Sequence, residues 1–525
     1  MKLERASGVL AHPTSFPGPH GVGDMGAGSY EFVDWLALGG QRYWQLMPLS
    51  PVGFGDSPYS ALSAFAGNPL LISIDGLAFL GLDHAGDSRG FNEYEVDFNA
   101  AGAYKYAALR RVYESFKEHG SPELREQLSA FEIAHASWLR DFALFMALKQ
   151  RFRNASWQDW PDEIRTRDQG TLTRVSAEMR DAIDFHSFIQ FLFRVQWTAL
   201  KQHANERGIQ IIGDIPIYVA LDSADVWANP EQFRLLADGR PEVVSGVPPD
   251  LFTTDGQLWG NPVFDWSYME ADGFSWWIER VRRLTELVDV VRFDHFRGLA
   301  AGWAIPAGDE TARGGRWERA PGSELFRAIE ASLGHLPIVV EDLGIITPDV
   351  HALRMAHGLQ GMKVLQFGFD GDPDNAYLPH NYDRDCVVYT GTHDNQTTIG
   401  WFQSCSEVDR QQVQTYLGTD GSDIAWDFIR LAFESVADMA IVPLQDVMRL
   451  GDDARMNRPG TAVGNWKWRY LSHQLNDGMA RGLRELSGAY GRLERPKIER
   501  GYDPFDYSAP DTAHPLFDRN DPKAS

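Results

Sequence analysis

Four short apolar segments of the chain each lead into one or two carboxylates. If these segments are parallel strands of a barrel, their carboxyl ends meet at one rim, where barrel enzymes keep their active sites. Several acids on one rim repel one another, so their presence there needs a functional reason. Cleavage of a glycosidic bond is one such reason, because one carboxylate serves as nucleophile or base and a second carboxyl group donates a proton. The candidates are Asp214, Asp294, Glu341 or Asp342, and Asp394.

The neighbours of two of these acids predict opposite charge states. Arg292 and Asp294 share one face of a strand, and a guanidinium beside an aspartate lowers its pKa, as a carboxylate nucleophile requires. Glu341 follows three apolar residues, and loss of solvation raises the pKa of a glutamate, as a proton donor requires. Asp342 alternates with Glu341 along the strand, so the spacing leaves open which of the two faces the site.

A single aspartate at the end of a strand is more often a helix N-cap than a catalytic group. Four such sites together, with Arg292, His295 and His393 interleaved, instead indicate a cluster of interacting titratable groups. His393 is either a structural histidine or, beside Asp394, a donor of a hydrogen bond to a sugar hydroxyl.

Eight short, β-rich apolar segments supply a scaffold for the carboxylates. Their near-continuous hydrophobicity is typical of strands that are buried on both faces, as in a parallel sheet. We therefore predict an α/β fold, a (β/α)8 TIM barrel with inserted, mainly helical subdomains and long active-site loops. The segments are Arg42–Met47, Pro69–Ile74, Ile209–Asp214, Val288–Phe293, Pro337–Glu341, Lys363–Phe367, Cys386–Thr390 and Ala440–Leu444.

Two connections between these segments are too long for simple crossovers. The first, residues 75–208, has apolar stripes at helical spacing and an N-cap serine before proline at Ser121, so it is predicted to be an inserted, mainly helical subdomain. The second, about residues 215–285, has no sustained period and is predicted to be a long irregular loop. The barrel is assigned to residues 1–74 and 209–525.

The composition argues against several kinds of partner. The chain has 525 residues and a formal net charge of −24, from 49 Lys and Arg against 73 Asp and Glu. Such a chain lacks the clustered cations that bind nucleic acid or anionic lipid, and no uncharged apolar stretch approaches the ~20 residues of a membrane span. Its two cysteines, Cys386 and Cys405, suit a reducing compartment, so we expect a cytoplasmic protein. Its 17 Trp residues suit stacking on sugar rings.

Several long, distinctive motifs are distributed along almost the whole chain. They are SFPGPHGVGDMG, QLMPLSPVGFGDSPYSALSAFAGNPLLI, IIGDIPIYV, SGVPPDLFTTDGQLWGNPVFDW, VVRFDHFRGL, VVEDLG, GTHDN and GNWKWRY. In sequence and order they closely resemble the amylomaltase or disproportionating-enzyme family of 4-α-glucanotransferases, relatives of the α-amylases. The resemblance implies transfer of α-1,4-glucan segments between maltooligosaccharide, starch or glycogen chains, by a double displacement that retains the α configuration. It implies glucan donors and acceptors as partners, and no cofactor or catalytic metal.

The same resemblance assigns roles to individual residues. Asp294 resembles the nucleophile, Glu341 rather than Asp342 resembles the acid/base, and Asp394 resembles the third carboxylate, which grips ring hydroxyls and distorts the sugar. Asn465 and Trp466 lie in a family motif without an assigned role. The expected substrate-binding residues are Asp214, Arg292 and His393 around the cleaved sugar, Tyr59 as a stacking ring, Asp250 in a mobile loop over the cleft, and Trp259 on the acceptor side.

Two alternatives to a glucan transferase are an α-glucan hydrolase of the amylase type and a catalytically silent glucan-binding protein. The silent protein predicts a missing acid, and none is missing. Segment 245–262 favours transfer over hydrolysis, because a loop that covers the site lets a sugar hydroxyl reach the intermediate while limiting water. His295 and His393 lack further partners at ligand spacing, so no metal site is predicted.

Overall fold

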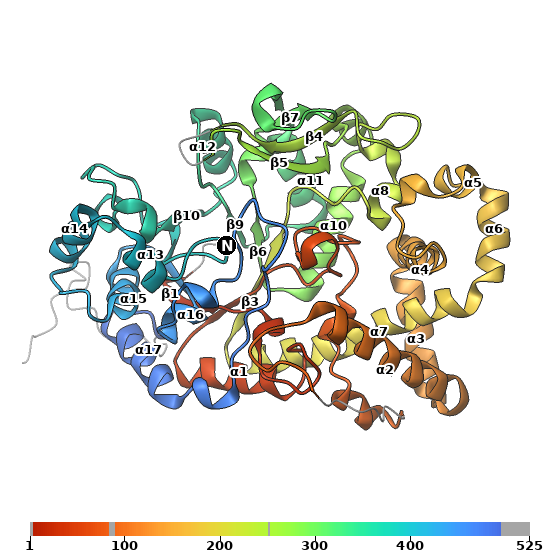
Figure 1. The fold of residues 1–525 in the computed structure, drawn as a ribbon, viewed down its shortest axis with the longest axis horizontal. Helices are drawn as coiled ribbons and strands as arrows, with labels where there is room; N and C mark the ends of the chain where they lie inside the picture. The colour runs from red at the N-terminus through yellow and green to blue at the C-terminus, as the bar shows by residue number, and fades with distance from the viewer. Residues whose placement is uncertain (1–3, 83–89, 250–252, 495–525) are drawn as a thin grey trace, which may run out of the picture. The chain divides into compact units, whose positions relative to one another are not determined.

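Eight parallel strands form the centre of the computed structural model, which describes residues 4–82, 90–249 and 253–494 (Figure 1). Around the sheet the strands follow their order in the chain. The edge strands β9 and β10 meet through a parallel bridge between Val339 and Gln360, which closes the barrel. The (β/α)8 prediction is therefore confirmed. The strands are β1 (Ala6–Leu10), β2 (Tyr43–Gln45), β3 (Gln210–Ile215), β6 (Val290–Phe293), β9 (Ile338–Val340), β10 (Gly361–Val364), β11 (Cys386–Tyr389) and β12 (Met439–Pro443).

Buried residues of these strands alternate between two hydrophobic clusters. One cluster fills the barrel interior and includes Ile212, Val290, Val339 and Tyr389. The other packs the outside of the barrel against the helices and includes Ile211, Val291, Val340 and Val388. Because side chains alternate along a strand, the same alternation decides which residues at the strand ends point to the barrel axis.

One predicted strand, Pro69–Ile74, is wrong. The segment forms the 3-10 helix η3 (Pro69–Leu71), because side chains of two helices take up its backbone groups. The buried ammonium group of Lys105 donates to the carbonyls of Leu70 and Ile72, each at 2.8 Å, and pairs with Asp24. The Gln196 amide bonds both the N–H and the carbonyl of Ser73.

The strand that takes its place in the barrel is β1, which pairs with β12 and β2 and which the sequence analysis missed. Its Gly8 lies where a Cβ would come within 2.4 Å of the Tyr43 carbonyl oxygen, so this short strand cannot be uniformly apolar and bulky. The seven other predicted segments overlap observed strands. The largest displacement is at β10, which begins at Gly361, two residues before the predicted Lys363.

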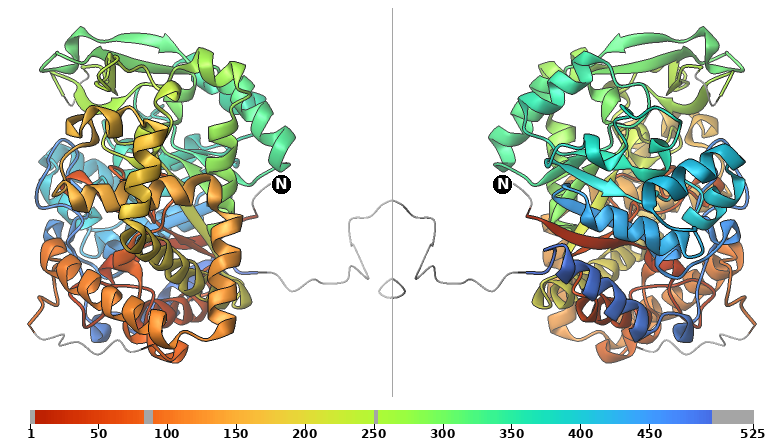
Figure 2. Two further views of the ribbon diagram at one scale, coloured as in Figure 1. Left: turned by 90° about the vertical axis from the view of Figure 1, so that its right-hand side faces the viewer. Right: turned by 90° about the vertical axis from the view of Figure 1, so that its left-hand side faces the viewer.

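The connection between β2 and β3 is mainly helical, as predicted. The Ser121 hydroxyl accepts the N–H of Leu124 at 3.2 Å, which confirms the predicted N-cap. Figures 1 and 2 show these helices in orange and yellow on one side of the barrel. The division into a barrel and a separate subdomain stays a prediction. The helices are α2 (Phe98–His119), α3 (Pro122–Ala134), α4 (Ala136–Arg151), α5 (Asp162–Arg165), α6 (Gln169–Glu178) and α7 (Arg180–Glu206).

The second long connection is not the irregular loop that was predicted. Two of its segments, β4 (Val243–Val247) and β5 (Gln257–Pro262), pair antiparallel with each other. Strand β4 also pairs with β7 (Ala301–Pro306), and β7 pairs with β8 (Arg316–Arg319), which completes a four-stranded sheet at the top of Figure 1. Strand β7 follows barrel strand β6 in the chain and is therefore distant in sequence from β4. No local periodicity could indicate this pairing.

The other helices lie between the strands or after the last one. None of the helices within the described ranges is both long and apolar enough to cross a membrane. They are α1 (Ala27–Leu38), α8 (Ala224–Ala228), α9 (Trp266–Ala271), α10 (Ser275–Leu287), α11 (Gly322–Leu333), α12 (Pro348–Ala356), α13 (Thr398–Ser404), α14 (Glu407–Leu417), α15 (Ile424–Glu434), α16 (Leu444–Val447) and α17 (Asp477–Ala489).

Candidate active site

Three of the predicted carboxylates lie at the C-terminal ends of neighbouring barrel strands. Asp214 is in β3, Asp294 directly follows β6 and Glu341 directly follows β9, and these strands are adjacent in the sheet. Each acid stands an even number of residues beyond an interior strand residue, so strand alternation aims it at the barrel axis. Those interior residues are Ile212, Val290 and Val339.

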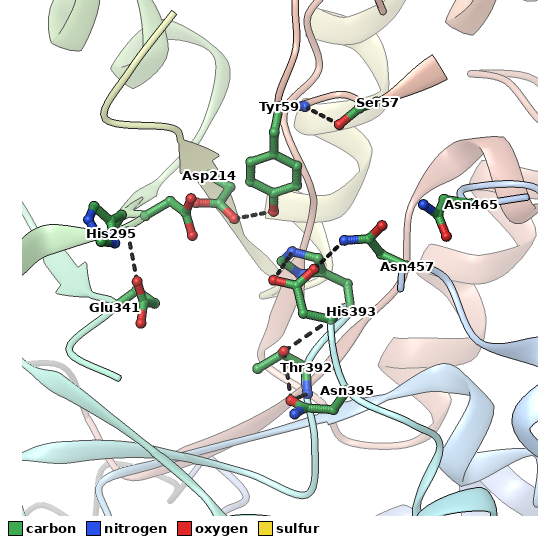
Figure 3. A network of polar contacts seen from close by, with 12 residues as sticks. Ser57, Tyr59, Asp214, His295, Glu341, Thr392, His393, Asn395, Asn457 and Asn465 are labelled. Carbon is green, nitrogen blue, oxygen red and sulfur yellow. Dashed lines mark hydrogen bonds and ion pairs between the residues drawn. The ribbon is translucent and has the colours of Figure 1, made fainter. Parts of the chain in front are cut away.

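Arg292 connects two of these acids. Its Nη1 bonds Oδ2 of Asp214 and lies 3.0 Å from Oδ1 of Asp294. The Tyr59 hydroxyl donates to the same Oδ2 of Asp214 at 2.7 Å (Figure 3). Arg292 and Asp214 are buried, whereas the Asp294 side chain keeps 26% of its surface exposed. Of Asp214, Arg292 and Asp294, it is therefore Asp294 that a ligand can reach.

The net pKa shift of Asp294 is opposite to the predicted one. Burial raises its pKa well above the ordinary aspartate value, and Asp214, Glu341 and Asp394 raise it further. Arg292 lowers it, as expected, but does not outweigh these contributions. Adjacent residues in the sequence identified the arginine, whereas the opposing carboxylates come from other strands and loops.

Glu341 is held by backbone N–H groups. Its Oε2 accepts the N–H of His295 at 2.8 Å (Figure 3). Its Oε1 accepts the N–H of Leu343 at 2.8 Å. Burial raises the pKa of Glu341 to about 7, although both N–H bonds and Arg292 oppose the rise. Asp342, one residue later, points away from the barrel axis. Its Oδ1 accepts the N–H of Met362 at 2.7 Å and its Oδ2 pairs with Arg354. The structure thus resolves the alternative left by the spacing, and it is Glu341 that faces the site.

Asp394 approaches from the loop after β11. Its Oδ1 accepts the side-chain amide of Asn457 at 2.6 Å, and its Oδ2 lies 3.4 Å from Nε2 of His393. The Arg455 guanidinium donates to the Asp394 carbonyl at 2.6 Å. The Asp394 side chain is 45% exposed and contributes to the electrostatic environment of Asp294. It is therefore an accessible carboxylate whose orientation is set by the loop after β12.

Aromatic rings pack beside these carboxylates. The Tyr59 ring stacks on the imidazole of His393 with centroids 5.1 Å apart, and Trp466 packs against both. Burial lowers the pKa of His393, so the imidazole is neutral at pH 7. On the opposite side, Trp259 of β5 is 38% exposed and packs edge-to-face on His295 at 4.7 Å. Trp259 thus presents exposed ring surface on which a sugar can stack, whereas His393 and Trp466 are buried and Tyr59 is half-buried.

One predicted site residue, Asp250, lies outside the described residues. The sequence analysis missed two other residues of the site, Asn457 and Arg455, because they lie more than 60 positions from the acid they contact. Their one signal is that they follow the last barrel strand, where any loop reaches the active rim. His295 was noted as part of the cluster, but its backbone contact with Glu341 has no sequence signal.

Within residues 4–82, 90–249 and 253–494, no group of three or more His, Cys, Asp or Glu is placed to hold a metal ion. The charged groups that a substrate can reach at this rim include Asp294 and Asp394, which are both partly exposed.

A closed parallel barrel with clustered carboxyl groups on its C-terminal rim is the arrangement of a glycoside-processing enzyme. The family model for glycoside hydrolase family 77, 4-alpha-glucanotransferase, matches residues 11–474. The chain is 48% identical to the 4-alpha-glucanotransferase of Thermus thermophilus over 94% of its own length and 100% of that protein. It is also 48% identical to the Synechocystis 4-alpha-glucanotransferase, over 94% of this chain and 99% of that protein.

A solved structure agrees with these sequence comparisons. Amylomaltase from Streptococcus agalactiae, in complex with acarbose, superposes with a TM-score of 0.90 at 38% identity, covering 94% of this chain and 100% of that one. The chain therefore belongs to glycoside hydrolase family 77, the 4-alpha-glucanotransferases. This confirms the predicted family and enzyme class and favours glucan transfer over the hydrolase and binding-protein alternatives.

Proposed function

We propose that this protein cuts an α-1,4 bond in a donor glucan and transfers the released segment to the 4-hydroxyl of an acceptor glucan, with retention of configuration. One observation carries the proposal. Two electrostatically coupled carboxyl groups end the neighbouring strands β6 and β9, and one of them pairs with Arg292 while backbone N–H groups hold the other. A retaining mechanism requires such a pair roughly 5–5.5 Å apart.

The reaction divides into two displacements. In the first, a carboxylate oxygen of Asp294 attacks the anomeric carbon, the glycosidic bond breaks, and the Glu341 proton goes to the departing 4-oxygen. In the second, ionised Glu341 takes the proton from the acceptor 4-hydroxyl, whose oxygen attacks the anomeric carbon and releases Asp294. Two inversions restore the α configuration.

The charge states for this cycle follow from the contacts. Both carboxyl groups have raised pKa values, so the pair retains a proton near neutral pH. Asp294 is in direct contact with the Arg292 guanidinium at 3.0 Å, and Glu341 forms no such ion pair with any residue that the structure describes. We assign the retained proton to Glu341, because an adjacent cation favours the ionised form of Asp294. Arg292 then acts as the counter-ion of the nucleophile.

The other residues of the rim bind sugar. Asp394 and His393 present a carboxylate and an imidazole to ring hydroxyls, and Tyr59 presents a ring face to the sugar that is cleaved. Asp214 holds both Arg292 and Tyr59 in place. On the other side of the cluster, exposed Trp259 is suited to stack on the acceptor. We retain Asp250 as a residue of the covering loop on the basis of the family resemblance.

Transfer rather than hydrolysis requires that a sugar hydroxyl compete with water for the intermediate. The segment 245–262, which includes β5 and Trp259, is the part of the chain to which we assign this role. We place the enzyme in the cytoplasm, because both of its cysteines are free thiols.

Incubation with maltotriose alone tests the proposed function. We expect glucose and a ladder of longer maltooligosaccharides, with a nearly constant concentration of reducing ends, because transfer exchanges one α-1,4 bond for another. Asp294→Asn is the matched control, since it keeps the size of the side chain and removes the nucleophile. Reducing ends that rise without longer products would identify a hydrolase and overturn the proposal.

A further inference from the structure

His295, directly after the proposed nucleophile, has a left-handed backbone with φ 50° and ψ 47°. This conformation is uncommon for a residue with a Cβ, and where it occurs the surrounding structure must hold it. It begins the 3-10 helix η7 (Phe296–Leu299) at the active rim. The conformation has a direct consequence for the neighbouring strand end.

Two successive N–H groups donate to Glu341. The N–H of His295 bonds the carboxyl Oε2 at 2.8 Å, and the N–H of Phe296 bonds the Glu341 carbonyl at 3.0 Å. In an extended strand, successive N–H groups point to opposite sides, so both cannot reach one residue. A left-handed residue turns consecutive N–H groups toward the same side. The backbone at His295 thus links the end of β6 to both the main chain and the side chain of Glu341.

The His295 ring is packed so that it locks this backbone. It meets the Trp259 ring edge-to-face at 4.7 Å and at 84°. Gly298 also lies close to the ring, because a Cβ at that position would be 3.1 Å from Cδ2 of the imidazole. Burial lowers the pKa of His295 to about 4, and its Nε2 is buried with no hydrogen-bond partner among the described residues. The ring is therefore a neutral packing element and not a proton carrier.

We propose that His295 is a positioning residue for Glu341, in which a ring clamped by Trp259 maintains the left-handed backbone that aims and stabilises the carboxyl group. The proposal rests on the acid/base role proposed above. It also connects the expected acceptor platform to the proton donor, because Trp259 touches the residue whose N–H bonds Oε2.

A pH profile can report this contact, because an N–H bond to a carboxylate favours the ionised form. Loss of the His295 bond should therefore raise the pKa of Glu341 further and move the basic limb of the rate profile to higher pH. The charged or titratable groups that face Glu341 are Arg292 and Asp294 at the end of β6, Asp342 on its own strand, and Tyr377 after β10. None of them is changed by a substitution at position 295.

The test compares His295→Ala with His295→Gly. Both variants lose the ring, and they differ in the Cβ that disfavours a left-handed backbone. We expect kcat for maltotriose to be about tenfold lower in His295→Ala than in His295→Gly, with the basic limb displaced to higher pH in His295→Ala. The defect should shrink with α-glucosyl fluoride, whose leaving group needs no proton. Asn154, exposed and also left-handed at φ 63°, provides the control pair Asn154→Ala and Asn154→Gly, which should differ only in melting temperature.

Equal kcat values and equal pH profiles for the two His295 variants would overturn the proposal. So would equal losses with maltotriose and with glucosyl fluoride in His295→Ala, because those indicate general damage to the site. Failure of the proposed function is distinguishable: the wild-type protein would then give no maltooligosaccharide ladder, whatever happens at position 295. Circular dichroism of each variant checks that the barrel folds.

Discussion

Glucosyl transfer from maltotriose is expected to fall as the pH rises above neutrality. Burial raises the pKa of Glu341 to about 7, and a general acid works only while it is protonated. The kcat/KM for maltotriose, which reports the first displacement, is therefore full below this pKa and is lost as the pH rises through it. One pH unit above the pKa, about a tenth of Glu341 keeps its proton, so kcat/KM should fall about tenfold per unit from there upward.

The choice of donor separates this effect from other titrations. We would measure kcat/KM from pH 5 to 9 with maltotriose, by glucose release, and with α-glucosyl fluoride, by fluoride release. Fluoride leaves without a proton, so its release should lack the basic limb that maltotriose shows. In Glu341→Gln, maltotriose turnover should fall by about 10²–10⁴, the usual contribution of a general acid, while fluoride release is largely kept.

Asp342→Asn is the matched control, because it changes the adjacent carboxylate, which bonds Met362 and Arg354 outside the site. Its basic limb should persist with maltotriose and move only to lower pH, because the Asp342 charge is one of the contributions that raise the pKa of Glu341. The reasoning would be refuted by an equal basic limb with both donors, or by a maltotriose limb centred below pH 5. The first result would assign the titration to substrate binding, and the second would show that burial does not raise the pKa of Glu341.

Four further results are expected. Asp294→Asn should lower turnover by several orders of magnitude while glucan binding, measured by calorimetry, persists. Asn457→Ala removes a 2.6 Å hydrogen bond to the Asp394 carboxylate. It should lower kcat/KM about tenfold to a hundredfold, the cost of losing one hydrogen bond to a charged group. Unchanged kinetics would show that Asp394 does not need this hydrogen bond. Lys105→Met leaves Asp24 buried without its cation and should destabilise the fold by about 3–5 kcal/mol, seen as a lower Tm, whereas Arg313→Met in an exposed pair should change the Tm little. Activity should survive exhaustive EDTA treatment, and a loss reversed by one divalent cation would contradict the metal-free mechanism.

Much of the site could be predicted because local periodicity encodes it. Arg292 and Asp294 are two residues apart, so any strand at that place puts them on one face. The run of apolar residues before Glu341 indicated burial, and burial is the main cause of its raised pKa. The N-cap at Ser121 was equally readable, since it needs only neighbouring residues.

Predictions failed where the deciding partner is distant in the chain. Pro69–Ile74 has the composition of a strand, yet Lys105 and Gln196 supply bonds to its backbone that a strand would have to make with other strands. The β4–β5 hairpin appeared irregular because its third strand, β7, follows later in the chain. For Asp294, the sequence identified the adjacent cation but not the burial and the distant acids that together outweigh its effect on the pKa.

The sequence by itself determined the family and the fold class and pointed to the candidate carboxylates, because long motifs, short spacings and alternation along a strand are local features of a chain. Only the tertiary structure decided the charge balance and the aim of those groups. It turned Asp342 outward, brought Asn457 to Asp394, and placed the N–H of His295 against Glu341. The physical reason is that pKa values and hydrogen bonds depend on distances of a few ångströms, which are set by the closure of the barrel and the packing of its loops.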